Sequence, residues 1–559
     1  MGRVVSVEGS QVIAILDDRQ AEGESPAPGS PQIGALMKMR TPETVVYGLV
    51  TGLSIPDPVN AGGGGEHKIM ELELLGEAEG SPETGLRAFQ RGVSAHPALG
   101  DPVFTTVLED LSKVYAKPTV SCVRIGAIHQ DKSLPAFVLT DDLLGKHFAI
   151  LGTTGSGKSC AVSLVLRAIL SRHNHGHVLL LDPHNEYSRA FGKAAEIVTP
   201  ADLELPYWLM NFEEIKEIVL SGRKSEREST ILSEIVVAAK RLYQREAGDT
   251  DVITVDTPIP YRLSDVTRLI DERLGKLDRP EDNAPYLRVK SRLASLQADR
   301  RFAFLFPGLQ VRDNMAQVLS RLFRIPVDGK PITILDLSGV PSEILNVVVS
   351  LLCRMTFDFA MWSDRASPTL LVCEEAHRYA SQDSTQGFEP TKRALARIAK
   401  EGRKYGVSLC VVSQRPAELA PGMLSQCSTI FALRLSNQKD QEFVRGVLSE
   451  SAVGLMESLP SLRNAEAIVV GEGVSVPYRV CFDILPDQYR PKSGTASFAK
   501  AWDSDPDDGF DIVGATIRRW RRQQRSGAGA TKAAAEIDAA PAPPASAANG
   551  ANGARTSTS

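Results

Sequence analysis

One glycine-rich stretch has the residue types and the spacing that hold phosphate groups. It begins at Gly152 and reads G-T-T-G-S-G-K-S, which fits the phosphate-binding pattern G-x-x-x-x-G-K-S. The glycines let the backbone curl until successive N–H groups point at one anion, and Lys158 would reach the β- and γ-phosphates. The hydroxyl of Ser159 would be a ligand of Mg²⁺. We expect ATP and Mg²⁺ as cofactors, with ATP held by Gly152, Thr153, Thr154, Gly155, Ser156, Gly157, Lys158, Ser159 and Cys160.

The segments on either side of this loop favour a nucleotide site over a flexible Gly/Ser linker. An apolar run, predicted to be a buried strand, ends at Leu151, and a helix is predicted from Lys158 to about Arg172. The positive end of that helix would face the same phosphates as the loop. A strand, a glycine turn and a helix in this order therefore predict a P-loop.

Polar residues at the ends of other apolar runs would complete a hydrolytic site. Glu374 and Glu375 follow one such run, and we assign Glu374 to the Mg²⁺ shell and Glu375 to the attacking water. Two adjacent acids also begin ordinary loops, so this pair indicates an ATPase only together with the P-loop. Gln414 follows a further buried strand, where it would lie beside the γ-phosphate and report bound nucleotide.

A third apolar run, His177–Asp182, is typical of a parallel strand buried on both faces. Polar residues occupy positions 182–187 at its carboxyl end, and residues so placed point into the ligand crevice of such sheets. The alternative is that they cap the next helix. Both interpretations stay open at this point.

A basic segment, residues 393–406, would supply an arginine to a neighbouring subunit. Its predicted helix follows the Glu374–Glu375 strand and runs away from the ligand-facing end of that strand, so its last turn lies far from the P-loop of the same chain. Arg403 is the leading candidate and Arg397 the second, because an arginine supplied in trans neutralises transition-state charge. A basic helix end that complements its own dipole is the alternative for either residue.

Composition limits the class of protein. A chain of 559 residues, 43% hydrophobic and 23% charged, is globular material for two or three domains. The net charge of −5 means that any contact with nucleic acid must be local. The seven cysteines show no C-x-x-C pairing and mostly lie in apolar runs, as expected in a reducing cytoplasm. With no N-terminal signal and no apolar stretch of about 18 residues recognised, we expect neither export nor a membrane span.

The order of apolar patterns divides the chain into three parts. Short alternating runs in residues 1–125 suggest a small β-barrel. Strands that alternate with helices over residues 126–490 predict a doubly wound α/β sheet, with a helical insertion at about 206–324. Residues 491–559 are poor in large hydrophobic residues and are expected to be mostly disordered.

These residues together resemble the HerA family of hexameric DNA-translocating ATPases, which are relatives of FtsK. Several stretches carry the resemblance in family order, over roughly residues 140–440. They are Gly152–Ser159, Asp182–Tyr187, Leu205–Leu209, Asp336–Pro341, Glu374–His377, Lys400–Gly406 and Ser413–Pro416. A glutamate at the metal position, where many P-loop enzymes carry aspartate, agrees with this family. The long Ala/Pro-rich tail has no counterpart that we can name.

The resemblance implies a RecA-like P-loop ATPase core with an inserted helical bundle, preceded by a barrel similar to the family's HAS barrel. It further implies a ring of six subunits with ATP bound between neighbours and duplex DNA threaded through the pore. Members commonly work with a nuclease such as NurA, or with another effector in anti-phage systems. The sequence itself shows no nuclease constellation, so a partner would cut the DNA.

Two alternatives remain beside an ATP-dependent DNA helicase or translocase. A conjugation or secretion ATPase that moves protein or protein–DNA substrates would have the same ring and P-loop, but such motors usually meet a membrane channel. A nucleotide-sensing scaffold would hydrolyse ATP slowly and without regard to DNA. Stimulation of ATP hydrolysis by duplex DNA would distinguish a DNA helicase or translocase from these two alternatives.

Overall fold

The computed structural model describes most of the chain. The described residues are 1–16, 31–55, 68–80, 86–199, 202, 205–220, 225–247, 252–276, 280–299, 302, 305, 311–340, 342–383, 387–448, 454–492, 498–503 and 509–522. The chain forms two compact units, residues 1–495 and residues 496–559. Each unit is described by itself below.

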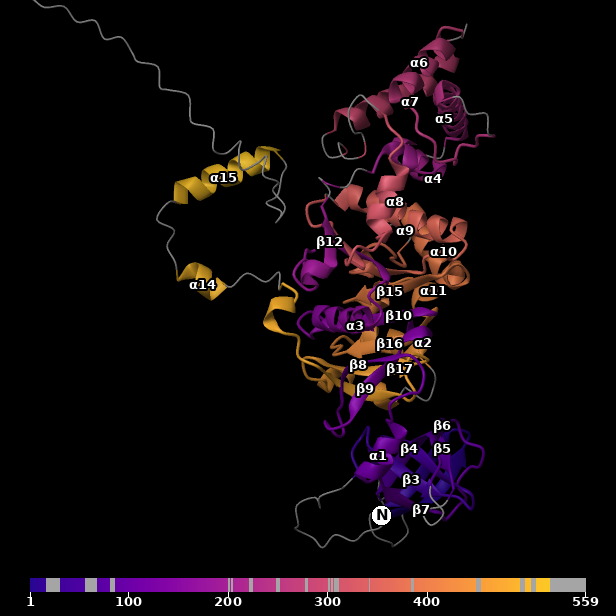
Figure 1. The fold of residues 1–559 in the computed structure, drawn as a ribbon, viewed down its shortest axis with the longest axis vertical. Helices are drawn as coiled ribbons and strands as arrows, with labels where there is room; N and C mark the ends of the chain where they lie inside the picture. The colour runs from indigo at the N-terminus through magenta and orange to yellow at the C-terminus, as the bar shows by residue number, and fades with distance from the viewer. Residues whose placement is uncertain are drawn as a thin grey trace, which may run out of the picture. The chain divides into compact units, whose positions relative to one another are not determined.

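The chain begins with a closed β-barrel, which confirms the fold expected for this region. Strand pairing runs β2-β1-β7-β3-β4-β5, and a further antiparallel pairing of β5 with β2 closes the circle. A short strand, β6 (Phe89–Arg91), extends the sheet beyond β5. The indigo part of Figure 1 shows these strands wrapped around one another. Their bounds are β1 (Gly2–Glu8), β2 (Gln11–Leu16), β3 (Leu36–Arg40), β4 (Thr44–Ser54), β5 (Ile69–Glu79) and β7 (Pro102–Thr105).

The barrel is closed because alternate residues of each strand face a common interior. Val12, Ala14, Met39, Val46 and Met70 are fully buried and form one apolar cluster. Residues between them face outward or pack elsewhere, as the two-residue period of a strand requires. A closed sheet also leaves few unpaired strand edges.

A large mixed sheet forms the centre of the following region. Among the described residues it has eleven strands. In spatial order they are β12 (Ala195–Val198), β13 (Ile332–Asp336), β11 (His177–Asp182), β14 (Thr369–Cys373), β15 (Val407–Ser413), β10 (His147–Leu151), β16 (Cys427–Leu433), β17 (Glu466–Gly471), β18 (Tyr478–Phe482), β8 (Cys122–Ile128) and β9 (Pro135–Leu139). Neighbours from β12 to β16 are parallel, and those from β16 to β9 are antiparallel.

The carboxyl ends of the parallel strands meet at one edge of this sheet. Leu151 at the end of β10 pairs with Ser413 at the end of β15. Cys373 at the end of β14 pairs with Leu181 of β11, one residue before that strand ends. Every residue of β10, β14 and β15 is buried, which explains the continuous apolar runs in the sequence. The sheet is the α/β P-loop core that the sequence predicts, and its ligand edge collects the predicted site residues.

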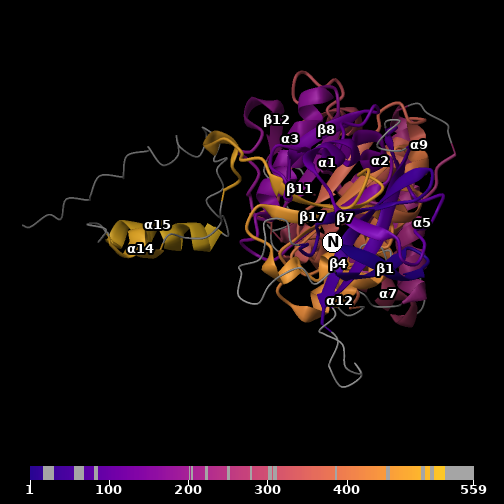
Figure 2. The same ribbon diagram turned by 90° about the horizontal axis from the view of Figure 1, so that it is seen from below.

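Helices join the parallel strands. The first, α3 (Lys158–Arg172), follows the P-loop, has the bounds expected from the sequence and packs against β10 and β8. Figures 1 and 2 both show α3 beside β8. The helices α9 (Ser342–Trp362) and α10 (Glu389–Tyr405) pack against each other and against β15.

The expectation that no apolar stretch reaches membrane-spanning length is wrong for α9. Residues Ile344–Trp362 are the one helix of the described chain that is long and apolar enough to cross a membrane, and 72% of its most apolar window is buried in the fold. Two charged residues within the helix hid this pattern. Arg354 pairs with Asp358 at 2.9 Å and with Glu214 at 3.2 Å. In this structure α9 is a core helix that covers the sheet.

The described chain between β12 and β13 is mainly helical, as the helical spacing of apolar residues in this range predicts. They are α4 (Phe212–Leu220), α5 (Glu226–Ala247), α6 (Leu263–Leu274), α7 (Pro280–Ala298) and α8 (Met315–Phe323). All five helices lie within the range of about 206–324 in which the sequence predicts a helical insertion. The division of the chain into domains at particular residues stays a prediction.

The unit formed by residues 496–559 contains two helices in a segment expected to be mostly disordered. They are α14 (Phe498–Trp502) and α15 (Gly509–Arg522). In α15, Val513, Ile517 and Trp520 are spaced by four and three residues, which is the spacing of one face of a helix. The low overall content of large hydrophobic residues, on which the prediction of disorder rests, does not reveal this pattern. The Ala/Pro-rich residues 523–559, to which the prediction of disorder chiefly applied, lie outside the described residues, as does Pro341 of the family motif.

Candidate nucleotide site

The backbone of the P-loop curls where the glycines permit it. Gly155 and Gly157 have φ angles of +77° and +97°, which favour glycine. A side chain at Gly157 would lie 3.2 Å from the backbone nitrogen of Ala465, whereas one at Gly155 would have no heavy atom within 4 Å. The loop is therefore packed on the side of β17 and open at Gly155.

Two hydroxyls of the loop stabilise this curl. Ser156 Oγ donates a hydrogen bond to the carbonyl of Thr153 at 2.7 Å. Thr153 Oγ1 and its backbone N–H donate to the carbonyl of Arg434, each at 3.0 Å. These contacts tie the loop to the end of β16, so Thr153 and Ser156 have structural partners as well as a predicted place around ATP. Cys160 lies exposed in the first turn of α3.

Lys158 is buried between the two predicted carboxylates. Its Nζ donates a hydrogen bond to Glu374 Oε1 and lies 3.7 Å from Glu375 Oε1, and its side chain is 5% exposed. Burial alone would lower the pKa of the ammonium, but Glu374 and then Glu375 outweigh it and hold the pKa above its usual value. The lysine is therefore charged at neutral pH and confined to the mouth of the loop.

Glu374 has one oxygen that nothing in the described structure satisfies. Its Oε1 accepts from Lys158, while its Oε2 is buried without a hydrogen-bond partner. Burial raises the pKa of this carboxyl, with Lys158 acting in the opposite direction. A buried, unpartnered carboxylate oxygen beside a P-loop serine is a fit for a hard cation, which seeks oxygen ligands.

Glu375 is held in place by two neighbours and by its own backbone. Its Oε1 accepts a hydrogen bond from Gln414 Nε2, and its Oε2 lies 3.3 Å from His377 Nδ1. The residue has a φ of +52°, an uncommon backbone conformation for a side chain of this size. Such a conformation persists only where the surroundings impose it, and it is frequent at functional sites.

Gln414 links the P-loop to Glu375. Thr154 Oγ1 donates a hydrogen bond to Gln414 Oε1, and Gln414 Nε2 donates to Glu375 Oε1. The chain Thr154–Gln414–Glu375 thus connects the phosphate-binding loop, the end of β15 and the end of β14. One amide group therefore lies between the P-loop and the Glu375 carboxylate.

The structure adds two residues to which the sequence analysis gave no role. Ser159 Oγ donates a hydrogen bond to Glu186 Oε2, which brings a further carboxylate to the predicted Mg²⁺ ligand. His377 Nδ1 lies 3.2 Å from Ser413 Oγ as well as near Glu375, and burial lowers its pKa. Both residues are polar and follow strand ends, which was the available signal, but only the fold shows what each one touches.

Asp182 folds back onto its own chain instead of pointing into the crevice. Its two oxygens accept hydrogen bonds from the backbone N–H groups of His184, Glu186 and Tyr187, at 3.3, 3.1 and 2.9 Å. This resembles the capping alternative, although it braces a turn rather than a helix. Burial raises the pKa of Asp182 to about 7, against those hydrogen bonds. The brace positions Glu186 toward Ser159.

The two arginine candidates lie away from these groups. Arg397 is 4.1 Å from the centre of the Phe357 ring and 3.7 Å from Asp358, so it packs on α9. Arg403 is exposed in the last turn of α10, which leads directly to the first residue of β15. Because the P-loop lies at the opposite end of the parallel strands, Arg403 is remote from the P-loop of its own chain.

Comparison with known proteins finds relatives among helicases. Residues 123–356 match the family model described as the central domain of the helicase HerA. A DNA double-strand break repair helicase HerA from Pyrococcus furiosus is 24% identical over 500 residues, which are 83% of this chain and 84% of the relative. The chain is similar to the HerA family over most of its length. The HerA of Sulfolobus acidocaldarius is 27% identical over 393 residues, covering 69% of this chain and 74% of that one.

A solved structure also has a similar chain path. VirB4 of Thermoanaerobacter pseudethanolicus gives a TM-score of 0.45 at 18% identity and covers 67% of this chain and 99% of its own. The range 123–356 that matches the HerA central-domain model contains the P-loop and Glu186. Glu374, Glu375 and Gln414 lie beyond it, so their link to the P-loop rests on the sheet register and the contacts given above.

Proposed function

We propose that this chain hydrolyses ATP and uses the energy to move duplex DNA, as one subunit of a ring of six. The observation that carries the proposal is the buried group of Lys158, Glu374 and Glu375 at the mouth of the P-loop. Similarity to relatives that are named DNA double-strand break repair helicases supports DNA as the substrate.

The phosphates are bound by the loop and by Lys158. The ammonium is charged and is held by two carboxylates, so it is placed to transfer from them to the β- and γ-phosphates. Backbone N–H groups near Gly155, where the loop is open, surround the same anion. This movement frees Glu374 and Glu375 from the lysine and makes both carboxylates available for the reaction.

Ser159 and Glu374 are the residues that would hold Mg²⁺. The unpartnered Oε2 of Glu374 and the hydroxyl of Ser159, held by Glu186, supply the oxygen donors that the ion prefers. When bound, Mg²⁺ neutralises charge on the β- and γ-phosphates. Glu186 is close enough to orient Ser159 and to add a carboxylate next to it.

Glu375 would act as the base that polarises water. Gln414 and His377 fix the two oxygens of its carboxylate, so the direction of its lone pairs is set before the substrate arrives. Gln414 also contacts Thr154 of the P-loop, which would allow the base to respond to the occupant of the loop. We propose Arg403 of an adjacent subunit as the arginine that stabilises transition-state charge, with Arg397 as the second candidate.

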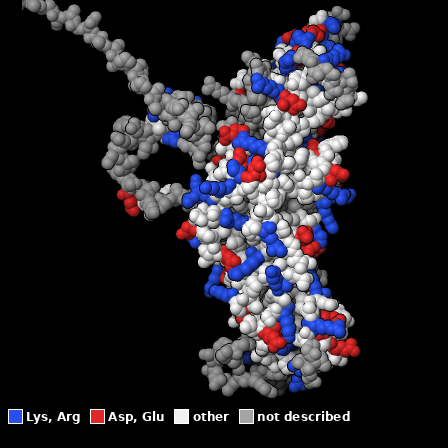
Figure 3. All heavy atoms as spheres, viewed as in Figure 1, with Lys and Arg blue, Asp and Glu red and all other residues white. Residues whose placement is uncertain are grey.

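The DNA contact in this proposal is local. Figure 3 shows Lys and Arg interspersed with Asp and Glu over the visible face of residues 1–495, in keeping with the net charge of −5. A ring would bring the same few basic residues of each subunit to one pore. We further propose that the protein is cytoplasmic. We also propose that it acts with a nuclease or another effector, because none of the groups described at this site would cut DNA.

The direct test is the rate of ATP hydrolysis by the full chain with and without duplex DNA. Stimulation by duplex DNA, absent in Lys158→Ala, is expected. Hydrolysis that DNA leaves unchanged would contradict the proposal and favour a motor for protein substrates or a nucleotide sensor. A control variant, Lys404→Ala, changes an exposed lysine at the far end of α10 and should keep the stimulation.

A further inference from the structure

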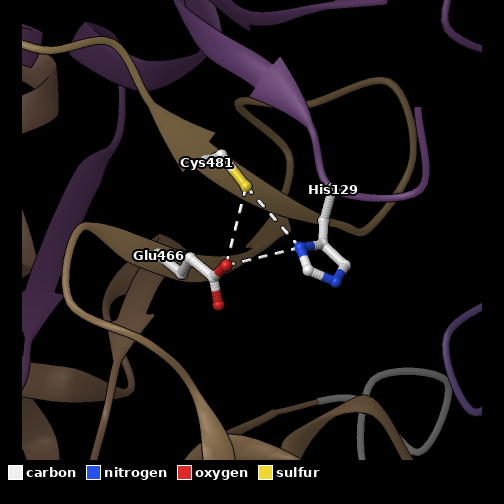
Figure 4. A group of neighbouring side chains, drawn as sticks. All are labelled: His129, Glu466 and Cys481. Carbon is white, nitrogen blue, oxygen red and sulfur yellow. Dashed lines mark hydrogen bonds and ion pairs between the residues drawn. The ribbon is translucent and has the colours of Figure 1, made fainter. Parts of the chain in front are cut away.

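A second cluster of potential ligands lies where three antiparallel strands meet. His129, Glu466 and Cys481 place one ligand atom each within 4.8 Å of the other two. Figure 4 shows the three side chains pointing toward one another, with Glu466 on β17, Cys481 on β18 and His129 directly after β8. They are far apart in sequence, and neither the P-loop chemistry nor the family resemblance uses them.

The strand register explains why these side chains share one face. Glu466 pairs directly with Cys481 across β17 and β18, so their side chains project from the same side of the sheet. Ala127 pairs with Cys481 across β18 and β8, and His129 lies two residues farther along on the same side. Because all three positions are fixed by backbone pairing, the cluster is built into the fold.

The distances in the cluster are those of metal ligands. His129 Nδ1 lies 3.4 Å from Glu466 Oε1 and 3.5 Å from Cys481 Sγ, and Cys481 Sγ lies 3.7 Å from Glu466 Oε1. Tetrahedral zinc with bonds of about 2.0–2.1 Å to N or O and about 2.3 Å to S separates its ligands by about 3.4 Å, or about 3.6 Å where one is sulfur. All three edges of the triangle agree with that geometry.

The surroundings orient the ligands. Glu466 Oε2 accepts from Arg479 Nη2 at 2.6 Å and from the backbone N–H of Arg463 at 3.0 Å, so the other oxygen, Oε1, faces the cluster. Such outer partners fix first-shell carboxylates in metal sites.

We propose that His129, Glu466 and Cys481 bind one zinc-class divalent cation, with water in the fourth position. His129 is 39% exposed, so solvent reaches that side of the cluster. Cys481 binds as the thiolate and releases its proton to solvent as the ion enters. The thiolate and the carboxylate together balance the charge of the ion.

The site lies next to the P-loop. Ala465, adjacent to Glu466, donates its backbone N–H to the carbonyl of Ser156 at 3.2 Å and accepts from the N–H of Phe482 at 3.0 Å. A metal bound to residues of β17 and β18 and to the residue after β8 would therefore hold these strands together close to Ala465, against which Gly157 packs. It would stabilise the folded P-loop without contacting nucleotide.

Cobalt titration of the metal-depleted full chain tests this site. With Mg²⁺ in excess to occupy oxygen-ligand sites, we expect one Co²⁺ per chain, with the thiolate-to-cobalt charge-transfer band and strong visible bands of a tetrahedral site. Zinc should displace the cobalt and remove the bands. Zinc should also raise the Tm of the wild-type chain but not that of Cys481→Ser.

Matched variants separate this cluster from other thiols and imidazoles. Cys481→Ser should lose the charge-transfer band. His129→Gln should weaken cobalt binding by at least about tenfold, because loss of a direct ligand should cost no less than loss of a residue that only orients a ligand, which costs about 10–100-fold. His175→Gln changes an exposed histidine elsewhere and should bind cobalt as the wild-type chain does. Circular dichroism checks that each variant is folded. Failure to bind stoichiometric cobalt, or a charge-transfer band that survives Cys481→Ser, would overturn the proposal.

Discussion

Replacement of Glu375 by glutamine should separate ATP binding from ATP hydrolysis. In Glu375→Gln the side chain keeps its shape and can still contact Gln414, but it no longer polarises water. We expect ATP affinity within a few-fold of wild type and a turnover at least about 100-fold lower, the usual share of a general base. Equilibrium binding and phosphate release measure the two quantities. Glu389→Gln, at the exposed start of α10, is the control. Loss of ATP binding in Glu375→Gln would instead exchange the roles given to Glu374 and Glu375.

Asp182 should leave a measurable trace in the pH dependence of stability. Its pKa is raised from 3.8 to about 7 in the folded chain, mainly by burial. Between those values the folded state holds a proton that the unfolded chain releases, so this carboxyl contributes less to stability as pH rises from about 4 to 7. The full effect is on the order of 4 kcal/mol.

The comparison of Asp182→Asn with wild type isolates that effect. The variant keeps one acceptor oxygen for the N–H groups of residues 184 and 186 but places an NH2 group where Oδ2 accepts from residue 187, a loss that does not change with pH. Its Tm minus the wild-type Tm should therefore increase from pH 5 to pH 7 and level off above pH 7. A difference that is flat, or that falls with pH, would show that Asp182 is not protonated in this range.

Which residues belong to the site could be predicted from the sequence only in part. The P-loop, Glu374, Glu375 and Gln414 could be placed because strand ends in a parallel sheet meet at one edge. The bond from Ser159 to Glu186 and the approach of His377 to Glu375 depend on turns whose shapes have no pattern in the sequence. The cluster of His129, Glu466 and Cys481 joins strands more than 300 positions apart in the chain, as the 352-residue separation of Cys481 and His129 shows.

At the scale of elements, α10 carries the test of a shared active site. The helix ends at Tyr405, immediately before β15 begins, and Arg403 is exposed in its last turn. We expect Arg403→Ala to assemble and bind ATP but to hydrolyse it at least about 10³-fold more slowly. Lys404→Ala, one position away and also exposed, should retain activity. Arg397→Ala should have a smaller effect, because Arg397 is engaged with Phe357 and Asp358.

Mixing inactive subunits sharpens this test. In rings of Arg403→Ala and Lys158→Ala subunits, some interfaces combine an intact Lys158 with an intact Arg403 of the neighbour. ATPase that recovers on mixing is expected for an arginine supplied in trans, when subunits exchange. Normal hydrolysis by Arg403→Ala alone with loss in Arg397→Ala would move the role to Arg397. Two active single variants would remove the role from α10.

Most helices and strands could be predicted, because their apolar residues repeat at the period of the element that buries them. The helix α3 and the strands β10 and β11 are local patterns of this kind. The buried charges of α9 could not be anticipated, since Arg354 is neutralised by Glu214, which lies 140 residues away. Closure of the barrel through pairing of β2 with β5 is likewise a tertiary contact that short alternating runs suggest but do not specify.

At the scale of the whole molecule, the second compact unit should be dispensable for catalysis. Deletion of residues 496–559 is expected to leave folding and basal ATPase within about twofold of wild type, because residues 1–495 form a compact unit of their own. A shorter chain that ends at Leu485 should lose activity. It removes Tyr489, whose ring lies 3.6 Å from Arg167 of α3, and Lys492, whose N–H donates to the carbonyl of Glu186 at 2.9 Å. Collapse of the assembly on the longer deletion would contradict the first expectation.

The tail should nevertheless add affinity for DNA. Arg518, Arg519 and Arg521 are exposed on α15. Their joint replacement by alanine should weaken duplex binding and reduce the slope of log affinity against log salt by up to about 2.7, at roughly 0.9 per phosphate contact. Fluorescence anisotropy over a range of salt concentrations measures both. An unchanged slope would show that these arginines do not contact phosphates.

We propose above all that ATP hydrolysis at Lys158, Glu374 and Glu375 drives this chain along duplex DNA. Displacement of a third strand from a triplex at the end of a linear duplex measures that movement directly, because a translocating ring strips the strand without unwinding the duplex. The full chain should displace the strand with ATP, after a lag that lengthens with the distance to the triplex. Glu375→Gln should bind the same DNA and displace nothing. Failure of the wild-type chain to displace the strand while it hydrolyses ATP, or equal displacement by Glu375→Gln, would contradict the claim.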